Sequence, residues 1–391
     1  MKIILNKLIG ISALLLVIAI PLNAQHNISL KVKSFSRLSP TDTIYAAGNF
    51  NNWDPAKTPL LFSAADSSWQ LHLKNVKDDV YQFKFTTGSW DKVEVTVKGM
   101  DIENHVIQLS SDTILNYHIA AWKHDFAAVS KKHTASAQVS IIDTAFYLPQ
   151  LNRKRRIWIY LPLNYATSKK HYPVLYMQDG QNLFDAFTSG YGEWGIDELL
   201  DSMQQQSNNA CIVVGIDNGP KRLNEYNPYD NEKFGKGEGK EYVDFLVKTL
   251  KPFIDRKYRT KASKENTLIG GSSMGGLISY YAALTQPEVF GKAGIFSPSF
   301  WIAPQILALT DSLSKKLNGK LFFYIGEMEG QQYEQDMINV MDKLGSNSST
   351  IIYSAVDPYG NHNEQAWKKW FPEFYKWMMA DWKNYIIRQD D

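Results

Sequence analysis

The chain has 391 residues, of which 44% are hydrophobic and 13% aromatic, and its 42 basic and 40 acidic residues leave a formal net charge of +2. This length and apolar content suffice for two domains with filled cores. Because the charges are balanced and form no basic stripe or block, the composition argues against nucleic-acid binding and against adhesion to a membrane surface.

The first 24 residues have the pattern of a secretory signal. Lys2 and Lys7 precede an uncharged apolar run, residues 8–22, and small residues follow up to Ala24. The run is shorter than the ~20 residues of a spanning helix. We therefore expect cleavage near Ala24, export to the periplasm or the medium, and no stable membrane insertion.

Residues 25–122 predict an antiparallel β-sandwich of the immunoglobulin type. Short runs alternate between apolar and polar residues, as in 29–33, 69–73 and 80–85, with turn residues between them. Half-buried strands have this period of two.

Two stretches of this domain, residues 47–53 and 81–90, carry a more specific signal. There the sequence resembles the starch- and glycogen-binding β-sandwich modules, and the resemblance covers most of the domain. It implies a polysaccharide partner, of plant or storage type, and a sugar platform built from Trp53 and Trp90, with Lys84 and Asn104 as hydrogen-bonding neighbours. An indole stacks on the apolar face of a sugar ring while polar groups bind hydroxyls. The alternative, a packing spacer without sugar binding, stays open.

Residues 123–138 are polar and lack a clear period, and we interpret them as a linker. From residue 139 to 391 the pattern changes to near-continuous apolar runs separated by helical segments such as 242–258 and 331–344. Strands buried on both faces have such runs, so a doubly wound α/β sheet is predicted. The single cysteine, Cys211, lies in one of these runs, so disulfides have no role within the chain.

Residues 268–277 place a Gly-x-Ser-x-Gly pattern between a strand signal and a helix signal. The middle serine is Ser273, flanked by Gly271 and Gly275. A nucleophile on a sharp strand-to-helix turn needs small residues on both sides. The pattern predicts a catalytic serine.

Such a serine needs a base and an acid further along the chain. His362 is the one histidine after Ser273, and it lies in a turn-rich loop that follows an apolar run. The acid is expected after the strand 321–325, where Glu327 and Glu329 both qualify; Asp336 and Asp357 are further alternatives.

Four motifs in this order, at 176–185, 271–275, 326–329 and 360–362, resemble the esterase-D-type "Putative esterase" family of α/β-hydrolases, which includes feruloyl, acetylxylan and enterochelin esterases. The resemblance spans residue 139 to the C-terminus and implies that Glu329 is the acid. It also implies an oxyanion hole from the backbone N–H groups of Met274 and Gln181.

The expected reaction is two-step acyl transfer from an ester to water, in which His362, oriented by Glu329, activates Ser273. No metal or organic cofactor is expected, because no cluster has metal-ligand spacing. We expect the loop 218–239 to select the substrate, together with Phe184, Trp194 and Trp301. The sequence leaves open whether these three aromatic side chains hold an aryl group or a sugar, or only pack. A carbohydrate-directed esterase is favoured; a siderophore esterase or acyltransferase and a catalytically silent sugar-binding protein are the alternatives.

Overall fold

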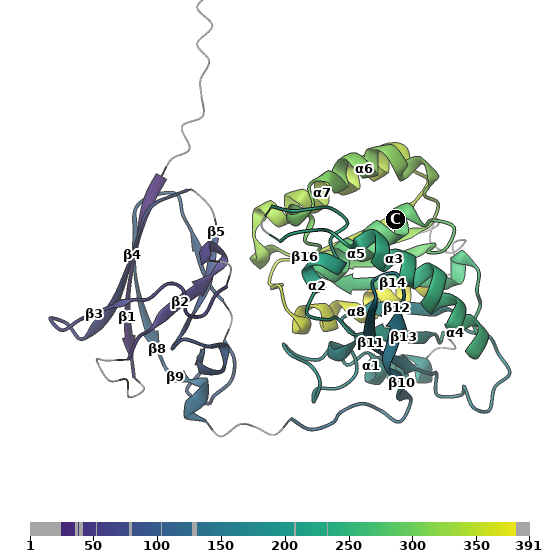
Figure 1. Cartoon of the computed structure of the whole chain (residues 1–391), viewed down its shortest axis with the longest axis horizontal. Coiled ribbons are helices and arrows are strands. Elements are labelled where there is room, and N and C mark those ends of the chain that lie inside the picture. Colours follow the sequence, from purple (N-terminus) through teal and green to yellow (C-terminus); the bar gives the residue numbers. More distant parts are fainter. Residues whose placement is uncertain are drawn as a thin grey trace, which may run out of the picture. The chain divides into compact units, whose positions relative to one another are not determined.

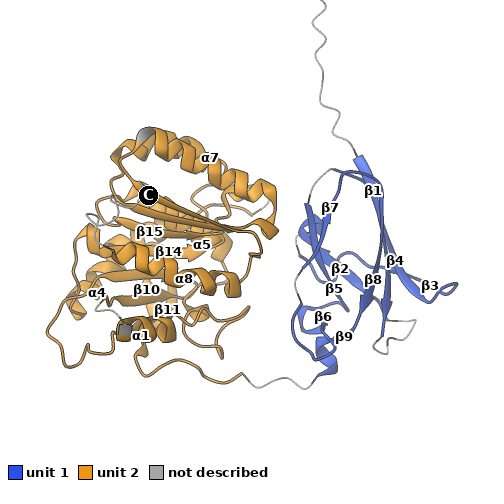
Figure 2. Ribbon diagram, turned by 180° about the vertical axis from the view of Figure 1, so that it is seen from behind, with its two compact units in different colours: residues 1–130 blue, residues 131–391 orange. Residues whose placement is uncertain are grey.

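The computed structural model describes residues 25–380 except 36–37, 39–41, 52, 78–79, 103, 127–130, 207–208 and 233. The predicted signal segment, residues 1–24, lies outside the described residues. The chain divides into two compact units, Met1–Ser130 and Lys131–Asp391 (Figure 2). Every helix within the described ranges is too short or too polar to cross a bilayer.

The N-terminal unit is all β, as predicted. One sheet has the order β3-β4-β1-β8, a second has β2-β5-β7, and β6 pairs with β9. Neighbours are antiparallel except β1 and β8, which run parallel. The strands are β1 (Gln25–Ser34), β2 (Tyr45–Gly48), β3 (Leu61–Ser63), β4 (Ser68–Lys77), β5 (Val80–Thr86), β6 (Glu94–Val95), β7 (His105–Gln108), β8 (Thr113–Ile119) and β9 (Ala121–Trp122).

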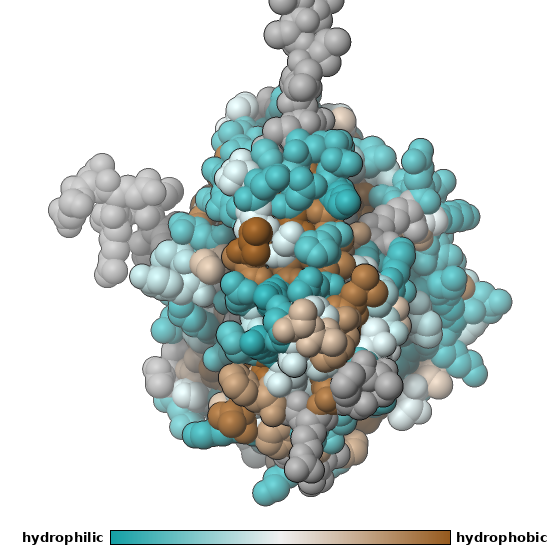
Figure 3. All heavy atoms as spheres, turned by 90° about the vertical axis from the view of Figure 1, so that its left-hand side faces the viewer, coloured by the Kyte–Doolittle hydropathy of each residue, from teal (hydrophilic) through white to brown (hydrophobic). Residues whose placement is uncertain are grey.

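Buried apolar side chains alternate with less buried polar ones along the strands, and the buried ones form the core of this unit. On β5, Tyr81, Phe83 and Phe85 are buried while Gln82 and Lys84 are less so. Large apolar side chains such as those of Leu61 and Ile114 are exposed. Figure 3, which faces the side of this unit, shows hydrophobic side chains in groups within a mostly hydrophilic surface.

The second unit is an α/β fold around one sheet with the order β10-β11-β13-β12-β14-β15-β16-β17 (Figure 1). The pairs from β13 through β17 are parallel, and β10 and β11 add an antiparallel edge. The strands are β10 (Val139–Leu148), β11 (Arg153–Tyr160), β12 (Val174–Gln178), β13 (Ile212–Ile216), β14 (Thr267–Ser272), β15 (Lys292–Phe296), β16 (Lys320–Gly326) and β17 (Ile351–Asp357).

Helices cover both faces of this sheet. Alternate strand residues point to opposite faces, so Tyr176 belongs to one core cluster and Met177 to the other. The first cluster includes residues of α3 (Gly239–Phe245), α4 (Lys251–Lys257), α5 (Met274–Thr285), α6 (Gln305–Leu313) and α7 (Gln331–Asn347), and the second includes residues of α1 (Ile196–Gln206) and α8 (Glu364–Met379). A π-helical turn, Leu246–Leu250, joins α3 to α4. The predicted helix 242–258 is therefore continuous.

The second half of the predicted linker binds to the second unit. His133 Nδ1 pairs with Asp185 Oδ2 at 2.7 Å, and the backbone N–H of Ser136 donates to Asp197 at 2.6 Å. Polar residues without a helical or strand period thus form specific hydrogen bonds before β10 begins.

Candidate active site

Ser273 occupies the sharp turn between β14 and α5. Its φ is 58° and its ψ is −123°, a conformation that is strained for a residue with a Cβ. The strand and the helix almost touch beside it, because a Cβ added to Gly271 would lie 2.9 Å from the Gly275 backbone. Steric crowding therefore explains why the sequence pattern has glycine at these two positions.

The loop after β15 holds this serine. The backbone N–H of Ser273 donates to Phe296 at 2.9 Å, and that of Ser299 donates to the carbonyl of Ser273 at 3.1 Å. The two hydroxyl groups, of Ser273 and Ser299, lie 3.2 Å apart. Sequence reasoning missed Ser299, although Ser297-Pro298-Ser299 follows directly after a buried strand at the edge that carries the site.

Glu329 and His362 form a pair at the ends of the next two strands. Glu329 lies in the turn Glu327–Glu329 after β16 and is 2% exposed. Its Oε2 lies 2.7 Å from Nδ1 of His362, and its Oε1 accepts from Ser297 Oγ at 2.6 Å and from the Gly326 N–H at 2.9 Å. Each carboxylate oxygen thus has a fixed partner, and one of them orients the imidazole.

Trp367 of α8 supports both members of this pair. Its indole N–H donates to Ser297 Oγ at 2.8 Å, and its ring contacts that of His362 edge to face, with centroids 5.2 Å apart. Ser297 and Ser299 share one short loop, so the partners of Ser273 and of Glu329 are two residues apart. In the described part of the chain, the Ser273 hydroxyl bonds to Ser299 and not to His362.

The two predicted oxyanion donors come from segments that pack together. Met274 begins α5, and the first N–H groups of a helix have no acceptor within the helix itself. Gln181 lies in the turn Gly180–Asn182 after β12. The preceding residue Asp179 has a left-handed backbone, φ 56°, and its carboxylate would be 3.2 Å from a Cβ at Gly275.

Asp179 binds a cation that the sequence did not single out. Both its oxygens accept from Arg222 of α2 (Arg222–Glu225), at 2.7 and 2.8 Å, and Oδ1 also accepts from Asn218 at 2.7 Å. Burial by itself would lower the pKa of Arg222, but the carboxylate of Asp179 outweighs it and raises that pKa. The ion pair ties the turn after β12 to the loop 218–239.

Glu364 links the histidine loop to the same turn. Its Oε1 accepts from Asn182 Nδ2 at 3.2 Å. Burial raises its pKa to about 7, and the charge of Asp179 acts in the same direction, while His362 and Arg222 oppose it. The protonation state of this acid therefore changes near neutral pH.

The other carboxylates considered for the acid lie in different surroundings. Glu327 is exposed. Asp336 accepts from Gln332 on the surface of α7 at 2.8 Å. Asp357 is buried but bonds to Lys369 and Trp370, at 2.7 and 2.9 Å. The hydrogen bond to His362 belongs to Glu329.

The aromatic residues expected to select the substrate separate into two kinds. Phe184 and Trp194 are 1% and 2% exposed and belong to the core; of the two roles left open for them, the structure supports packing, because their rings fill space beside the sheet. Trp301 is 46% exposed and follows Ser299 by two residues. Its ring lies 6.4 Å from that of Phe234 and 6.2 Å from that of Tyr333, and Asn231 donates to Ile302 at 3.0 Å. The loop 218–239 thus meets Trp301.

In the N-terminal unit the two candidate tryptophans lie together. The ring centroids of Trp53 and Trp90 are 6.3 Å apart, at 37° to each other, and Trp90 is 41% exposed. Lys84 shares the outward side of β5 with Gln82, which accepts from Asn104 at 3.3 Å. Gln82 is the member of this group that the sequence did not suggest.

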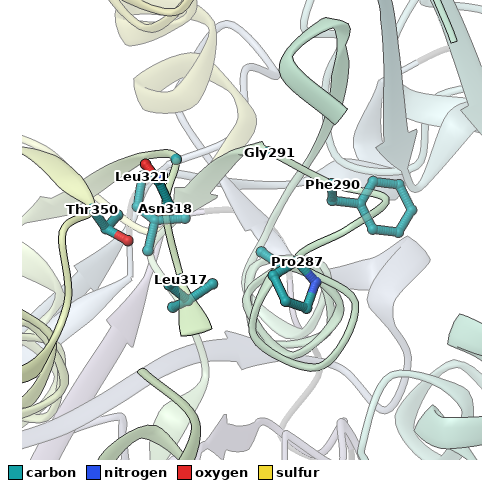
Figure 4. A pocket seen from close by; sticks show the side chains of 9 residues that line it. Pro287, Phe290, Gly291, Leu317, Asn318, Leu321 and Thr350 are labelled. Atoms are coloured by element: carbon teal, nitrogen blue, oxygen red, sulfur yellow. The ribbon is translucent and has the colours of Figure 1, made fainter. Parts of the chain in front are cut away.

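A small pocket of the second unit lies at the other end of the parallel strands, where they begin. Phe290, Leu317 and Thr350 line it, and each precedes the start of a strand (β15, β16 and β17); Figure 4 shows the side chains around Pro287. The elbow and the Glu329–His362 pair lie instead at the carboxyl ends of the parallel strands. This pocket is therefore separate from the candidate active site.

A strained serine between a central parallel strand and a helix, on a sheet covered by helices on both faces, defines an α/β-hydrolase. The model of the family described as "Putative esterase" matches residues 149–379. The chain belongs to this family and is a carboxylic ester hydrolase.

Three curated relatives illustrate the range of this similarity. The chain is 30% identical to "Uncharacterized protein YbbA" of Bacillus subtilis over 48% of this chain and 74% of that protein. It is 27% identical to the "Endo-1,4-beta-xylanase/feruloyl esterase" of Xylanibacter ruminicola, over 48% of this chain but only 25% of that protein. It is 26% identical to the "Ferri-bacillibactin esterase BesA" of Bacillus subtilis, over 43% and 63% of the two chains.

Two solved structures share the fold. The BES protein from Bacillus cereus matches with a TM-score of 0.54 at 18% identity, over 66% of this chain and 100% of that one. The enterobactin esterase FES from Shigella flexneri matches with a TM-score of 0.53 at 14% identity, over 87% of this chain and 88% of that one. The second match is longer than the hydrolase unit and so includes residues of the N-terminal unit.

Proposed function

We propose that the protein is a serine carboxylesterase with the triad Ser273, His362 and Glu329. The observation that carries the proposal is the strained backbone of Ser273 at the same sheet edge as the 2.7 Å pair of Glu329 and His362. His362 takes the hydroxyl proton as Ser273 attacks the ester carbonyl, then gives it to the leaving alcohol. In the second step, His362 takes a proton from water as the water attacks the acyl-enzyme carbonyl, and it returns the proton to Ser273 as the acid leaves.

The N–H groups of Met274 and Gln181 stabilise the negative oxygen of the tetrahedral intermediate in this proposal. Backbone donors aimed at that oxygen contribute roughly 3 kcal/mol each. Two features favour this arrangement: the position of Met274 at the start of α5, and the left-handed backbone of Asp179, which turns the chain at the end of β12 beside the elbow.

For the substrate, we propose an ester that joins an acetyl or feruloyl group to a carbohydrate. The relative named as a feruloyl esterase and the exposed ring of Trp301 beside the nucleophile loop support this choice, because a flat ring stacks on an aryl group or a sugar. Export, through the signal pattern of residues 1–24, belongs to the same proposal.

A siderophore ester is the second candidate, and two comparisons favour it. One relative is named as a ferri-bacillibactin esterase, and the fold match to an enterobactin esterase extends into the N-terminal unit. Neither the triad nor the oxyanion hole would differ for this substrate.

An ester panel tests these proposals. It compares nitrophenyl acetate, methyl ferulate, acetylated and feruloylated xylans, and a cyclic catecholate triester. We expect the highest kcat/KM on an acetylated or feruloylated sugar. A kcat/KM on the triester that exceeds those on the sugar esters more than tenfold would assign the second candidate.

The N-terminal unit is proposed to hold polysaccharide through Trp53 and Trp90. Replacement of both by alanine should abolish retardation of the protein in gels that contain starch, glycogen or xylan, since each stacked ring contributes ~1 to 3 kcal/mol. Hydrolysis of a small soluble ester should stay within twofold of the wild-type rate. Unchanged migration of the wild type in all three gels would instead make this unit a spacer.

Arg222 is expected to matter for turnover because it neutralises Asp179 next to the proposed oxyanion hole. Arg222→Met should lower kcat by at least tenfold with a smaller change in KM, since the remaining carboxylate repels the developing oxyanion. Adding Asp179→Asn should restore part of the loss. A double-mutant cycle in kcat and in the free energy of unfolding measures this, and purely additive effects would contradict it.

A further inference from the structure

Asn182 is a buried residue of the turn that carries the proposed oxyanion donor Gln181. Its Oδ1 accepts from the Gly190 N–H at 3.1 Å, and its carbonyl accepts from the Trp194 N–H at 2.9 Å. Its own N–H donates to the carbonyl of Asp179 at 2.9 Å. Because Oδ1 accepts from a backbone N–H, the NH₂ group of this amide must point the other way, toward a different acceptor.

That acceptor is a carboxyl group at the start of α8. Nδ2 of Asn182 lies 3.2 Å from Oε1 of Glu364, and the two residues are only 6% and 7% exposed. The loop before α1 covers the pair, since a Cβ added to Gly192 would lie at contact distance, 3.4 Å, from the Cβ of Glu364. A buried hydrogen bond of this kind is kept, because its loss would leave a donor and an acceptor without water.

The start of α8 also holds His362. The side chain of Asn363 caps the helix by accepting from a backbone N–H of the first turn at 2.9 Å. Trp367, one turn later, contacts the ring of His362 edge to face. Glu364 lies between these two residues. Its bond to Asn182 therefore connects the turn of the proposed oxyanion donor to the segment that carries the proposed base.

The charges around Glu364 favour a neutral partner. Burial raises the pKa of Glu364 and the charge of Asp179 acts in the same direction, while His362 and Arg222 oppose it. The amide of Asn182 can donate to either form of this carboxyl group, because both forms have an oxygen that accepts. A carboxylate in place of the amide would repel the ionised form.

We propose that Asn182 and Glu364 are positioning residues of the esterase reaction, and that their hydrogen bond sets the place of the Gln181 N–H relative to His362. This inference rests on the proposed function, because it assigns a role within the same site. The oxyanion donor and the base act on one tetrahedral intermediate, and a displacement of about 1 Å can cost roughly a hundredfold in rate. Loss of the bond should therefore lower kcat and leave KM nearly unchanged.

The test is a cycle of substitutions in the full-length protein, measured on nitrophenyl acetate at pH 9, above the raised pKa of Glu364. Asn182→Asp keeps an oxygen for the Gly190 N–H but places a second carboxylate against Glu364. We expect kcat to fall at least tenfold while KM stays within threefold. Glu364→Ala breaks the same bond from the other side and should lower kcat by a similar factor.

A reversed pair tests whether the bond itself matters. Glu364→Gln should have the smaller effect on kcat, because its amide oxygen still accepts from Asn182. In Asn182→Asp/Glu364→Gln the glutamine NH₂ becomes the donor and the aspartate the acceptor. This double variant should recover kcat to within threefold of Glu364→Gln.

Asn339→Asp is the matched control. It makes the same change from amide to carboxylate on the exposed surface of α7, where Asn339 accepts from Gln335 at 3.1 Å. It should keep the kcat and KM of the wild type. Thermal unfolding of every variant ensures that kcat is compared between folded proteins.

Two results would overturn the inference while wild type is active. One is a kcat of Asn182→Asp and of Glu364→Ala within threefold of wild type, and the other is an Asn182→Asp loss that Glu364→Gln does not reverse. An inactive wild type that a fluorophosphonate probe leaves unlabelled would instead refute the proposed function, and this inference with it.

Discussion

Replacement of Ser273 by alanine is expected to lower ester hydrolysis by roughly 10⁴-fold or more, to the level that binding and an oxyanion hole alone support. The reason is that the proposed acyl-enzyme forms on its hydroxyl. His362→Ala should cost a similar factor, because no other described histidine follows the elbow in sequence. Combining the two changes should add little, since both act in one step.

The measurement is kcat on nitrophenyl acetate, together with labelling by a fluorophosphonate probe. The probe should label wild type at Ser273 and leave Ser273→Ala unlabelled. Ser299→Ala is the matched control, because the Ser299 hydroxyl is the neighbouring one, 3.2 Å from that of Ser273. Since Ser273 is the proposed nucleophile, this variant should keep most of the activity and all of the labelling. Undiminished turnover in Ser273→Ala would refute the assigned nucleophile.

Glu329→Gln is expected to lower kcat by more than tenfold, toward the ~10⁴-fold seen when a triad aspartate becomes an amide. Oε1 of Glu329 accepts from Ser297 and Gly326. A glutamine that keeps these two bonds must place its NH₂ group against Nδ1 of His362. The imidazole then carries its proton on Nε2, which is the wrong tautomer for a base that accepts from Ser273.

Glu327→Gln is the control for this change, because Glu327 is exposed in the same turn. It should change kcat less than twofold. Thermal unfolding of both variants separates a catalytic effect from a loss of fold. The reverse ranking of the two variants would move the acid to Glu327.

Local chemistry accounts for what the sequence predicted correctly. The near-continuous apolar runs after residue 139 form strands buried on both faces, and the alternating runs before residue 122 form a sandwich. Both outcomes follow from the period of burial along each strand. Gly271 and Gly275 marked the elbow because only a residue without a Cβ fits so close to the neighbouring strand and helix.

Long-range packing accounts for what the sequence could not predict. Glu327 and Glu329 are the same residue type two positions apart, so the sequence does not distinguish them. The turn after β16 buries Glu329 beside His362 and leaves Glu327 exposed to water. Phe184, Trp194 and Trp301 likewise looked alike, but two fill the core and one is exposed.

By itself, then, the sequence determined the two domain classes and the sharp strand-to-helix turn at Ser273, because each depends on residues that are adjacent in the chain or on their period, and it offered His362 as the candidate base. Only the tertiary structure decided which glutamate meets His362, that Arg222 neutralises Asp179 43 positions away, and that Thr134 and Ser136 reach Glu193 and Asp197. Those contacts join segments far apart in sequence, so they depend on strand order and helix packing, which local patterns do not encode.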